Sequence, residues 1–516
     1  MPDETLDLTA GVDLADIPAD GLLAGKVGDA DVMLARWTDD AGRPQVSALS
    51  AACTHRGAQL PTGLRVGDSV VCPFHHACFD LRNGEATHAP AFAPLDVYAV
   101  SVEGDRVTVN AKPEPAPAEP SRVDNDRGVT RVVVVGGGGG GFAAVERLRR
   151  VGYTGALALV SGEPNLPLDR PELSKNYLSG GKQATDLPLL PVDWYVEHDV
   201  DTHLGVTATA LDLAERVVTL SDGTELAYDA LVLSTGAEPV RPELPGFDRD
   251  DVFLLRTKDD ADALVAAATG ADEGVRVVVV GNGFIGLEAA AALRQRELDV
   301  TVVAPGAVPM ASQLGEDLGQ VLRGLHEENG TRFVEGRAAS WDGNALVLED
   351  GQRVEADLLV VGVGVQPRTA LAEAAGLAVE DGVVVDATFE TAVRGVFAVG
   401  DIARFPDPLT GRPIRVEHWA QAQRSGALAA VNLLGGQETL TEPPFYWTQQ
   451  FGKSFRLSGH AESLESGEAD GSAADRQLLV TFREEGRVVA AAGLGRDADL
   501  LAVEDAELRQ PARQAV

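Results

Sequence analysis

With 516 residues, 45% of them hydrophobic, the chain is long enough for several globular domains, because single hydrophobic cores seldom grow beyond about 250–300 residues. Its formal net charge of −36 argues against nucleic acids and anionic membranes as partners. No apolar run approaches the ~20 residues that cross a bilayer, and the acidic N-terminus is neither a secretory signal nor a transit peptide, so we expect a cytoplasmic protein.

The excess carboxylates are spread along the whole chain and are not gathered in a tail. They fit either an ordinary solvated acidic surface or adaptation to a salt-rich cytoplasm, in which dense carboxylates keep a protein hydrated. The sequence leaves both interpretations open.

Residues 1–112 consist of short alternating runs, such as DVMLARW and RVTVNAK, which Gly, Asp and Pro separate. This pattern predicts a small all-β domain. Residues 113–128 are rich in Pro and Glu and predict an extended, semi-rigid linker.

All three cysteines lie in the predicted β domain, and two of them form Cys53-x-His55 and Cys72-x-x-His75 patterns. Two thiolates and two imidazoles are the ligands of a Rieske [2Fe–2S] cluster, in which the thiolates hold one iron and the imidazoles the other. The flanking runs CTHRGAQL and CPFHHACFDLRNGEA match the two loops of Rieske ferredoxins. A zinc site with the same ligands is the alternative, but the C-x-H spacing does not suit a zinc finger.

His76 stands where the Rieske pattern has Gly, and we expect its side chain to be an exposed neighbour and not a third ligand. Cys78 is left over once Cys53 and Cys72 bind iron, so its role stays open.

High-potential Rieske proteins have two further cysteines in a disulfide, and Ser and Tyr hydroxyls that donate to the cluster. Ala58 and Phe74 stand in place of those cysteines, and Ala77 and Phe79 in place of the hydroxyls. Fewer hydrogen bonds to sulfur favour the oxidised cluster, so we expect a potential near the low end of the Rieske range.

From Arg131 the pattern becomes α/β, with a valine-rich strand, a glycine run, the helix FAAVERLRRV and a second strand. Gly136, Gly138 and Gly141 form G-x-G-x-x-G at this strand–helix junction, which predicts a dinucleotide site. The later segments LPLDRPELSK, LVLSTGAEP and GVFAVGDIARF are typical of flavoproteins that bind two dinucleotides. We therefore expect an FAD domain in two parts, residues 129–243 and 366–440.

Four side chains are predicted to contact this FAD. Asp401 would reach the ribityl chain, and Arg170 and Lys175 would flank the flavin. Gly162 occupies the usual place of the ribose-binding acid, so the neighbouring Glu163 is the candidate.

A second strand–glycine–helix–strand unit begins at Arg276, with Gly281, Gly283 and Gly286 as its fingerprint. It predicts an NAD(P)H-binding domain over residues 244–365. The following strand ends in Ala304 and Pro305, without the acid that binds ribose. No Arg or Lys follows closely to hold a 2′-phosphate, which favours NADH and leaves NADPH possible.

Residues 441–516 contain the hairpin-like run QLLVTFREEGRVVAAAGLG and predict a C-terminal α+β interface domain. The predicted fold is therefore multidomain: an N-terminal all-β Rieske domain, two Rossmann-like α/β domains for FAD and NAD, and this C-terminal domain.

Taken together, these segments resemble the Rieske-bearing apoptosis-inducing-factor-like proteins and the oxygenase-coupled ferredoxin reductases, over nearly the whole chain. The resemblance implies that Lys175 lies beside flavin N5 and pairs with Glu288. It further implies that Phe284 stacks on the nicotinamide or covers the flavin, and that His418 and Trp447 pack against the flavin ring.

The resemblance implies an NAD(P)H:ferredoxin-type oxidoreductase that passes electrons singly from FAD to its own [2Fe–2S] cluster, because a nicotinamide delivers two electrons and a cluster accepts one. The linker would keep the cluster at a high effective concentration near the flavin. The acceptor beyond the cluster, a protein or a small molecule, is unknown, and the chain is expected to be a monomer or a homodimer. The alternative function is an NADH-sensing redox switch in signalling.

The sequence excludes one other activity and argues against a second. A disulfide reductase would need a C-x4-C pair after the first βαβ unit, where there is no cysteine. A ring-hydroxylating oxygenase would need a mononuclear iron; His198 and His203 have the H-x4-H spacing, but Tyr195 replaces the preceding acid and both lie within the flavoprotein body.

We predict that the melting temperature rises with KCl concentration, because about 1 M salt screens repulsion among carboxylates within about 3 Å. Calorimetric melts of the full-length protein across a KCl series check this. A flat or falling curve would contradict adaptation to a salt-rich cytoplasm.

Overall fold

The computed structural model describes residues 6–39, 41–114, 121–269 and 274–509, and its contacts divide the chain into two compact units. One unit comprises Met1–Val123, Arg150–Gly152 and Asp497–Val503; the other comprises Asp124–Arg149, Tyr153–Arg496 and Glu504–Val516. Residues 115–120, in the middle of the predicted linker, lie outside the described part of the chain.

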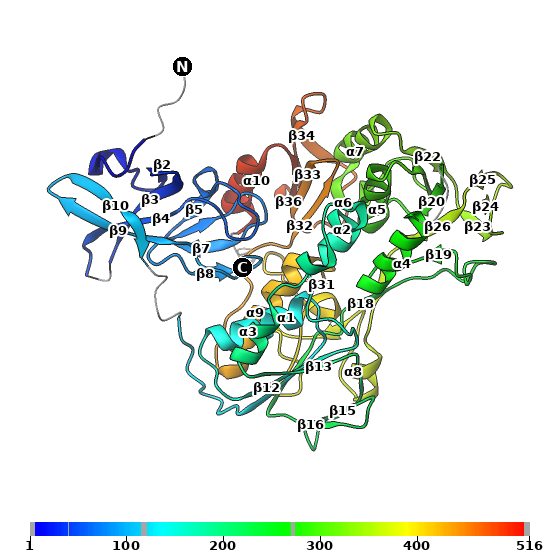
Figure 1. Cartoon of the computed structure of the whole chain (residues 1–516), viewed down its shortest axis with the longest axis horizontal. Coiled ribbons are helices and arrows are strands. Elements are labelled where there is room, and N and C mark those ends of the chain that lie inside the picture. Colours follow the sequence, from blue (N-terminus) through cyan, green and yellow to red (C-terminus); the bar gives the residue numbers. More distant parts are fainter. Residues whose placement is uncertain (1–5, 40, 115–120, 270–273, 510–516) are drawn as a thin grey trace. The chain divides into compact units, whose positions relative to one another are not determined.

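The first unit has the predicted all-β architecture, and its two sheets are antiparallel (Figure 1). The larger sheet has the order β1-β10-β9-β4-β3-β2 and is built from Val12–Asp13, Arg106–Glu114, Val97–Glu103, Pro44–Ser50, Ala30–Thr38 and Leu22–Val27. The smaller sheet has the order β5-β6-β7-β8, from Leu64–Val66, Ser69–Val71, Cys78–Asp80 and Ala86–His88. The two Cys/His loops follow β4 and β6, so strands on both sides of each loop hold it.

The second unit begins with a parallel sheet of order β13-β12-β11-β17-β29. Its strands are Val200–Leu204, Ala156–Ser161, Arg131–Val135, Ala230–Leu233 and Val396–Ala398. The central strand is a run of valines buried on both faces, as β-branched residues in a covered parallel sheet should be. Its last strand comes more than 150 residues after the others, so the chain leaves this sheet and returns to it.

A second parallel sheet has the order β19-β26-β20-β21-β22, from Val252–Phe253, Leu358–Val361, Arg276–Val280, Asp299–Ala304 and Arg332–Glu335. Each parallel sheet has a three-stranded antiparallel meander inserted in the chain, before β17 in the first sheet and before β26 in the second. The meanders are β14–β16 (Ala208–Asp212, Val217–Leu220, Glu225–Ala227) and β23–β25 (Ala338–Trp341, Ala345–Leu348, Arg353–Glu355). The two halves therefore repeat one architecture, as the two glycine fingerprints predict.

Helices cover these sheets, and a third, antiparallel sheet of order β32-β33-β36-β35-β34 completes the unit (Figure 1). Its strands are Phe445–Gln450, Lys453–Gly459, Arg487–Leu494, Gln477–Glu484 and Gly467–Ser472. The helices are α1 (Gly139–Arg150), α2 (Asn176–Ser179), α3 (Val192–Glu197), α4 (Lys258–Thr269), α5 (Phe284–Gln295), α6 (Ala311–Leu314), α7 (Glu316–Glu328), α8 (Ala370–Ala374) and α9 (Trp419–Leu434). The hairpin predicted near the C-terminus is β35–β36.

Helix α1 begins at Gly139, three residues earlier than its predicted start at Phe142. The first residues of the helix are glycines because the helix lies too close to its neighbours to leave room for side chains. A Cβ on Gly140 would be 2.9 Å from the Ser234 hydroxyl, and one on Gly426 of α9 would be 2.0 Å from the Gly140 carbonyl oxygen. These glycines allow close helix packing and do not form part of a turn.

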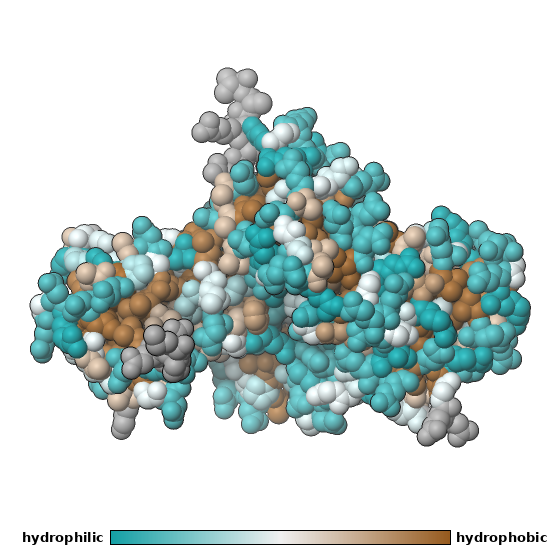
Figure 2. All heavy atoms as spheres, turned by 90° about the horizontal axis from the view of Figure 1, so that it is seen from above, coloured by the Kyte–Doolittle hydropathy of each residue, from teal (hydrophilic) through white to brown (hydrophobic). Residues whose placement is uncertain are grey.

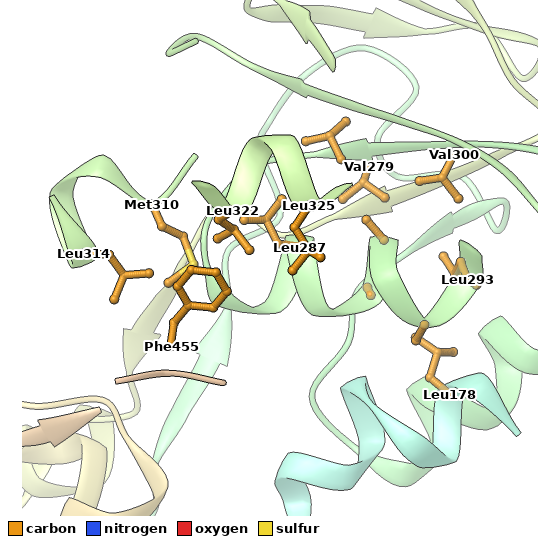
Figure 3. Packing of buried hydrophobic residues seen from close by; sticks show 14 of the residues in the cluster. Leu178, Val279, Leu287, Leu293, Val300, Met310, Leu314, Leu322, Leu325 and Phe455 are labelled. Carbon is orange, nitrogen blue, oxygen red and sulfur yellow. The ribbon is translucent and has the colours of Figure 1, made fainter. Parts of the chain in front are cut away.

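The core around α5 connects several parts of the second unit. This helix contacts α2, β21 and β32, and its residues from Gly286 to Leu293 are buried. Figure 3 shows Leu293 facing Leu178 of α2, and Leu287 beside Leu322 and Leu325 of α7. Any polar side chain on the inner face of α5 is therefore held by packing from several sides.

Hydrophilic residues cover most of the face shown in Figure 2. Among the described residues, several arginines form ion pairs with carboxylates, as Arg276 does with Asp357 at 2.8 Å. Among the described residues, no helix is long and apolar enough to cross a membrane.

Candidate active site

A single cavity of about 1900 Å³ in the second unit is lined by both glycine loops. Most of the residues predicted for the two dinucleotide sites line it. They are Gly136, Gly138, Glu163, Arg170, Lys175, Gly281, Gly283, Phe284, Glu288, Asp401, His418 and Trp447. The structure thus brings together positions up to 311 residues apart in the chain.

The first glycine loop leaves bare backbone at the cavity. Gly136 has φ +118°, and a Cβ there would be 1.9 Å from the Ser234 carbonyl oxygen. A Cβ on Gly138 would meet nothing within 4 Å, so this position is open to a ligand. Gly141 does not line the cavity; its Cβ would be 1.8 Å from the Gly136 carbonyl oxygen, so it permits close helix–strand packing.

The second loop repeats this geometry. Gly281 has φ +110°, and a Cβ there would be 2.2 Å from the Gly362 carbonyl oxygen. A Cβ on Gly283 would meet nothing within 4 Å, and one on Gly286 would be 2.4 Å from the Gly281 carbonyl oxygen. In both loops a helix N-terminus and bare backbone N–H groups face the same cavity, which suits the pyrophosphate of a dinucleotide. The residues present therefore fit two bound dinucleotides.

Two ion pairs lie at the wall beside the first loop. The Arg170 guanidinium pairs with Glu163, so the displaced acid after β12 does face the cavity. Burial lowers the pKa of Arg170, and the nearby Glu163 carboxylate opposes this shift. Asp401 pairs with Arg256 at 2.8 Å. The sequence analysis missed Arg256, because it lies in no recognised motif and meets Asp401 only through the fold.

Lys175 and Glu288 form the ion pair expected from the family resemblance. The Lys175 ammonium is 2.7 Å from Oε2 of Glu288, and the carboxylate side chain is only 4% exposed. Ser174 donates to the same oxygen at 2.5 Å, and Thr448 donates to Oε1 at 2.7 Å. Both carboxylate oxygens are thus satisfied although the group is buried.

An aromatic group lies at the same end of the cavity. The His418 ring is 4.4 Å from Trp447 in a T-shaped contact and 6.3 Å from Phe284, measured between ring centroids. Nε2 of His418 lies 3.1 Å from the Trp447 backbone nitrogen and 3.2 Å from the Trp447 carbonyl oxygen, so strand β32 holds this ring nitrogen in either tautomer.

Desolvation lowers the pKa of His418 to about 4, so the ring is neutral at pH 7. Its buried Nδ1 has no hydrogen-bond partner among the described residues. A polar atom held in this way in a residue that lines the cavity is suited to form a hydrogen bond with a bound ligand.

At the opposite end, Ala304 and Pro305 line the cavity where an acid would normally bind the coenzyme ribose. Arg337, between β22 and β23, and Glu349, between β24 and β25, line it as well. Both residues are exposed, so this end of the cavity offers a cation and a carboxylate. Neither residue belongs to the glycine fingerprint, so the sequence analysis missed both.

In the first unit the two Cys/His loops have matching backbone hydrogen bonds. Cys53 N–H donates to the Ala58 carbonyl and Cys72 N–H to the Ala77 carbonyl, each at 2.8 Å. Cys53 and Cys72 are 3% and 1% exposed. Their thiols form one pair, while Nδ1 of His55 and Nδ1 of His75 form another, 3.1 Å apart.

Each of these pairs fits one iron. Two nitrogens 3.1 Å apart can bind one ion, because metal–imidazole bonds are about 2.1 Å long. The hydrogen bond with Cys72 lowers the pKa of Cys53 to about 7, and the same contact raises the pKa of Cys72. In the described part of the chain, no three His, Cys, Asp or Glu side chains gather as ligands of a single ion. Two thiols and two imidazoles are the donor set of a dinuclear [2Fe–2S] cluster.

The expectation that His76 is exposed is wrong. The ring is 1% exposed, and the residue has φ +57°. A left-handed backbone at this position is why the pattern has Gly there, and here it turns the side chain inward. Cys78 lies on β7 with its Sγ 3.7 Å from the His76 carbonyl oxygen.

His198 and His203 are far from any metal-like arrangement. His198 stacks on Trp194 at 4.3 Å and bonds its carbonyl oxygen, and His203 pairs with Asp201. Both rings thus have contacts with neighbouring side chains or backbone.

Comparisons with known proteins bear on both units. A family model described as pyridine nucleotide-disulphide oxidoreductase matches residues 130–426, and a Rieske [2Fe-2S] domain model matches residues 11–99. Apoptosis-inducing factor 3 of Homo sapiens is 30% identical over 468 residues, which cover 87% of this chain and 76% of that protein.

Two further similarities are to reductases. The ferredoxin–NAD(+) reductase component of the anthranilate 1,2-dioxygenase system of Burkholderia cepacia is 38% identical over 68% of this chain and 88% of its own. The covalent putidaredoxin reductase–putidaredoxin complex contains a chain with a TM-score of 0.70 and 29% identity, over 74% of this chain and 94% of that one.

The buried Ala77 and Phe79 generate a prediction for the cluster loop, since both are fully buried beside Cys53 and Cys72. Ala77→Ser and Phe79→Tyr together should raise the cluster potential by about 60 mV. One hydrogen bond that favours the reduced form tenfold has this effect for one electron. Redox titration followed by EPR measures the shift. Ala35→Ser, which adds a hydroxyl elsewhere in the same core, is the control, and an unchanged potential in the double variant would contradict the prediction.

Proposed function

Because the chain belongs to the pyridine nucleotide-disulphide oxidoreductase family and carries a Rieske [2Fe-2S] domain, we propose that it transfers electrons from NAD(P)H to its own cluster and then to an external acceptor. The family confirms the predicted resemblance, fold class and cofactors: FAD, NAD(P)H and a [2Fe–2S] cluster. It also confirms an NAD(P)H-dependent oxidoreductase of the ferredoxin-reductase type.

The observation that carries the proposal is the coexistence, in one chain, of a cavity with two dinucleotide loops and a pair of Rieske loops. In the putidaredoxin reductase–putidaredoxin complex, the reductase is linked to a second protein. Here the chain has a cluster domain of its own, so the first electron acceptor would be internal. The external acceptor would be a protein or a small molecule, and a cytoplasmic location, where thiols stay reduced, belongs to the same proposal.

We propose that the sheet with β11 binds FAD and the sheet with β20 binds the nicotinamide coenzyme. Gly136 and Gly138 would receive the FAD pyrophosphate, with Glu163, Arg170 and Asp401 holding its ribose and ribityl parts. Gly281 and Gly283 would receive the coenzyme. The third glycine of each fingerprint, Gly141 or Gly286, lies outside the cavity lining and lets the helix pack close to the loop. Bound FAD supplies the chemistry that links two-electron and one-electron transfer.

The remaining residues would act on the reacting end of the cavity. Lys175 places a positive charge there, which favours a ring that gains negative charge, and Glu288 orients it. Phe284, His418 and Trp447 form an aromatic group that would shield the transfer from water, and His418 would offer its Nδ1 to the bound ligand. Cys53, His55, Cys72 and His75 would hold the cluster.

The similarity to Apoptosis-inducing factor 3 supports one other function, a redox switch that responds to NADH. Turnover separates the two functions. An electron carrier reduces an added one-electron acceptor many times per molecule, whereas a switch forms a long-lived reduced complex.

We predict that Cys72→Ser abolishes the Rieske EPR signal and leaves NAD(P)H-driven flavin reduction at the wild-type rate, because the cluster and the flavin belong to separate units. EPR and stopped-flow absorbance measure the two properties. Cys78→Ser, which removes a neighbouring thiol outside the ligand set, is the matched control and should keep the signal. Zinc in place of iron in the wild-type protein would overturn the cluster, and loss of FAD from Cys72→Ser would show that the units do not fold separately.

We further predict that Lys175→Ala slows flavin reduction by at least about tenfold, or roughly 1.4 kcal/mol in the barrier. Glu288→Ala should have a similar effect. The double variant should be little slower than either single one, since the two residues act as a unit. Stopped-flow rates for the three variants provide the test; additive effects, or a wild-type rate for Lys175→Ala, would show that the pair does not assist reduction.

A further inference from the structure

A chain of buried polar side chains extends from Glu288 away from the cavity. Gln450 donates through Nε2 to Oγ1 of Thr448 at 3.0 Å, and Thr448 in turn donates to Glu288. Nε2 of His326 lies 2.5 Å from Oε1 of Gln450, and its Nδ1 lies 3.3 Å from the Thr331 hydroxyl. The chain thus joins α5, β32 and α7, which are far apart in the sequence.

Chemistry fixes the direction of every hydrogen bond in this chain. The Gln450 carbonyl oxygen only accepts, so His326 must donate through Nε2, and its Nδ1 accepts from Thr331. Burial lowers the pKa of His326 to about 4, so the ring is neutral at pH 7 and carries the one proton that this arrangement requires. Each donor therefore points toward Glu288, which is left as an acceptor at both oxygens.

The hydrogen-bonded side chains from Thr448 to His326 do not reach solvent, so they do not suit proton transfer. Thr448 and His326 are 0% exposed and Gln450 is 2% exposed, so the hydrogen-bonded chain ends in the protein core. Phe451 and Phe333 hold the His326 ring in edge contacts, with centroids 5.0 and 5.9 Å away. A closed, fully satisfied network of this kind fixes side-chain orientation.

The orientation matters because Lys175 depends on it. Apart from Glu288, the only hydrogen bond recorded for the ammonium in the described part of the chain is to the Pro171 carbonyl oxygen, at 3.3 Å. Without the Thr448 hydroxyl, Oε1 of Glu288 would be a buried acceptor that lacks its donor. The carboxylate would then rotate or become protonated, and the ammonium would lose its fixed direction.

We propose that Thr448, supported by Gln450 and His326, is a positioning residue for the Lys175–Glu288 pair. It acts from behind the pair and does not touch the cavity contents. This inference rests on the proposed function of that pair in flavin reduction.

The test compares Thr448→Val, which keeps the shape and removes the hydroxyl, with Thr448→Ser, which keeps the hydroxyl. In the full-length holoprotein we expect Thr448→Val to slow flavin reduction roughly fivefold and to lower the flavin midpoint potential, and Thr448→Ser to restore both. Thr301→Val is the matched control. It removes another buried threonine hydroxyl, on β21 and outside the cavity lining, and should alter neither property even if it lowers the melting temperature.

Coupling to Glu288 is the second readout. Thr448→Val combined with Glu288→Ala should be no slower than Glu288→Ala alone, because the hydroxyl acts through the carboxylate. If Thr448→Val does not retain FAD, Gln450→Leu, which removes the donor to Thr448, should slow reduction in the same direction. Loss of FAD from both variants would overturn the inference, since the hydrogen-bonded side chains would then be needed for folding.

The outcomes also separate this inference from the proposed function. A wild-type rate and potential for Thr448→Val, with Lys175→Ala and Glu288→Ala slow, would overturn the inference alone. Wild-type rates for Lys175→Ala and Glu288→Ala would overturn the role of the pair itself.

Discussion

The second unit depends on the burial of one carboxylate. Taking an ionised group out of water costs several kcal/mol unless charges and hydrogen bonds replace the lost solvent. Glu288 obtains these from the neighbouring Ser174 and Lys175, more than 110 residues before it in the chain, and from Thr448, 160 residues after it. The same segments contribute Leu173, Leu287 and other apolar residues to one core, so the ion pair and the core form only together. The catalytic geometry is therefore a property of the assembled unit and not of any one motif.

The two glycine loops have the same backbone conformation, and each suits one dinucleotide. In each, the first glycine has a positive φ and lies against the carbonyl of a neighbouring strand, the second is open, and the third lets the helix approach the loop. The parallel sheets have matching strand orders, so both helix N-termini reach the same cavity. What distinguishes the halves is their surroundings: paired carboxylates and guanidinium groups at the first loop, and Ala304 with Pro305 beyond the second.

Local patterns made much of this predictable. Valine runs before glycine loops indicated both parallel sheets, and the two Cys/His patterns indicated the cluster loops, since each depends on residues close in sequence. The Lys175–Glu288 pair came from family resemblance alone, because 113 residues separate its members. Arg256 and the Thr448–Gln450–His326 chain were missed because they are contacts between distant side chains with no sequence signature. The buried His76 was misjudged because its orientation depends on a left-handed backbone that residue type alone does not reveal.

Helix α5 has two connections that bear on how the ligands influence each other. Its N-terminus is the second glycine loop, and Glu288, little more than one turn later, holds the ammonium on the opposite wall of the cavity. If binding of one dinucleotide shifts this helix, the free energy of that shift therefore changes the binding free energy of the other dinucleotide. Thermodynamic linkage makes such an effect reciprocal: the factor by which bound FAD changes coenzyme affinity equals the factor by which the coenzyme changes FAD affinity. Because both sites share helix α5, the occupancy of one site depends on the occupancy of the other.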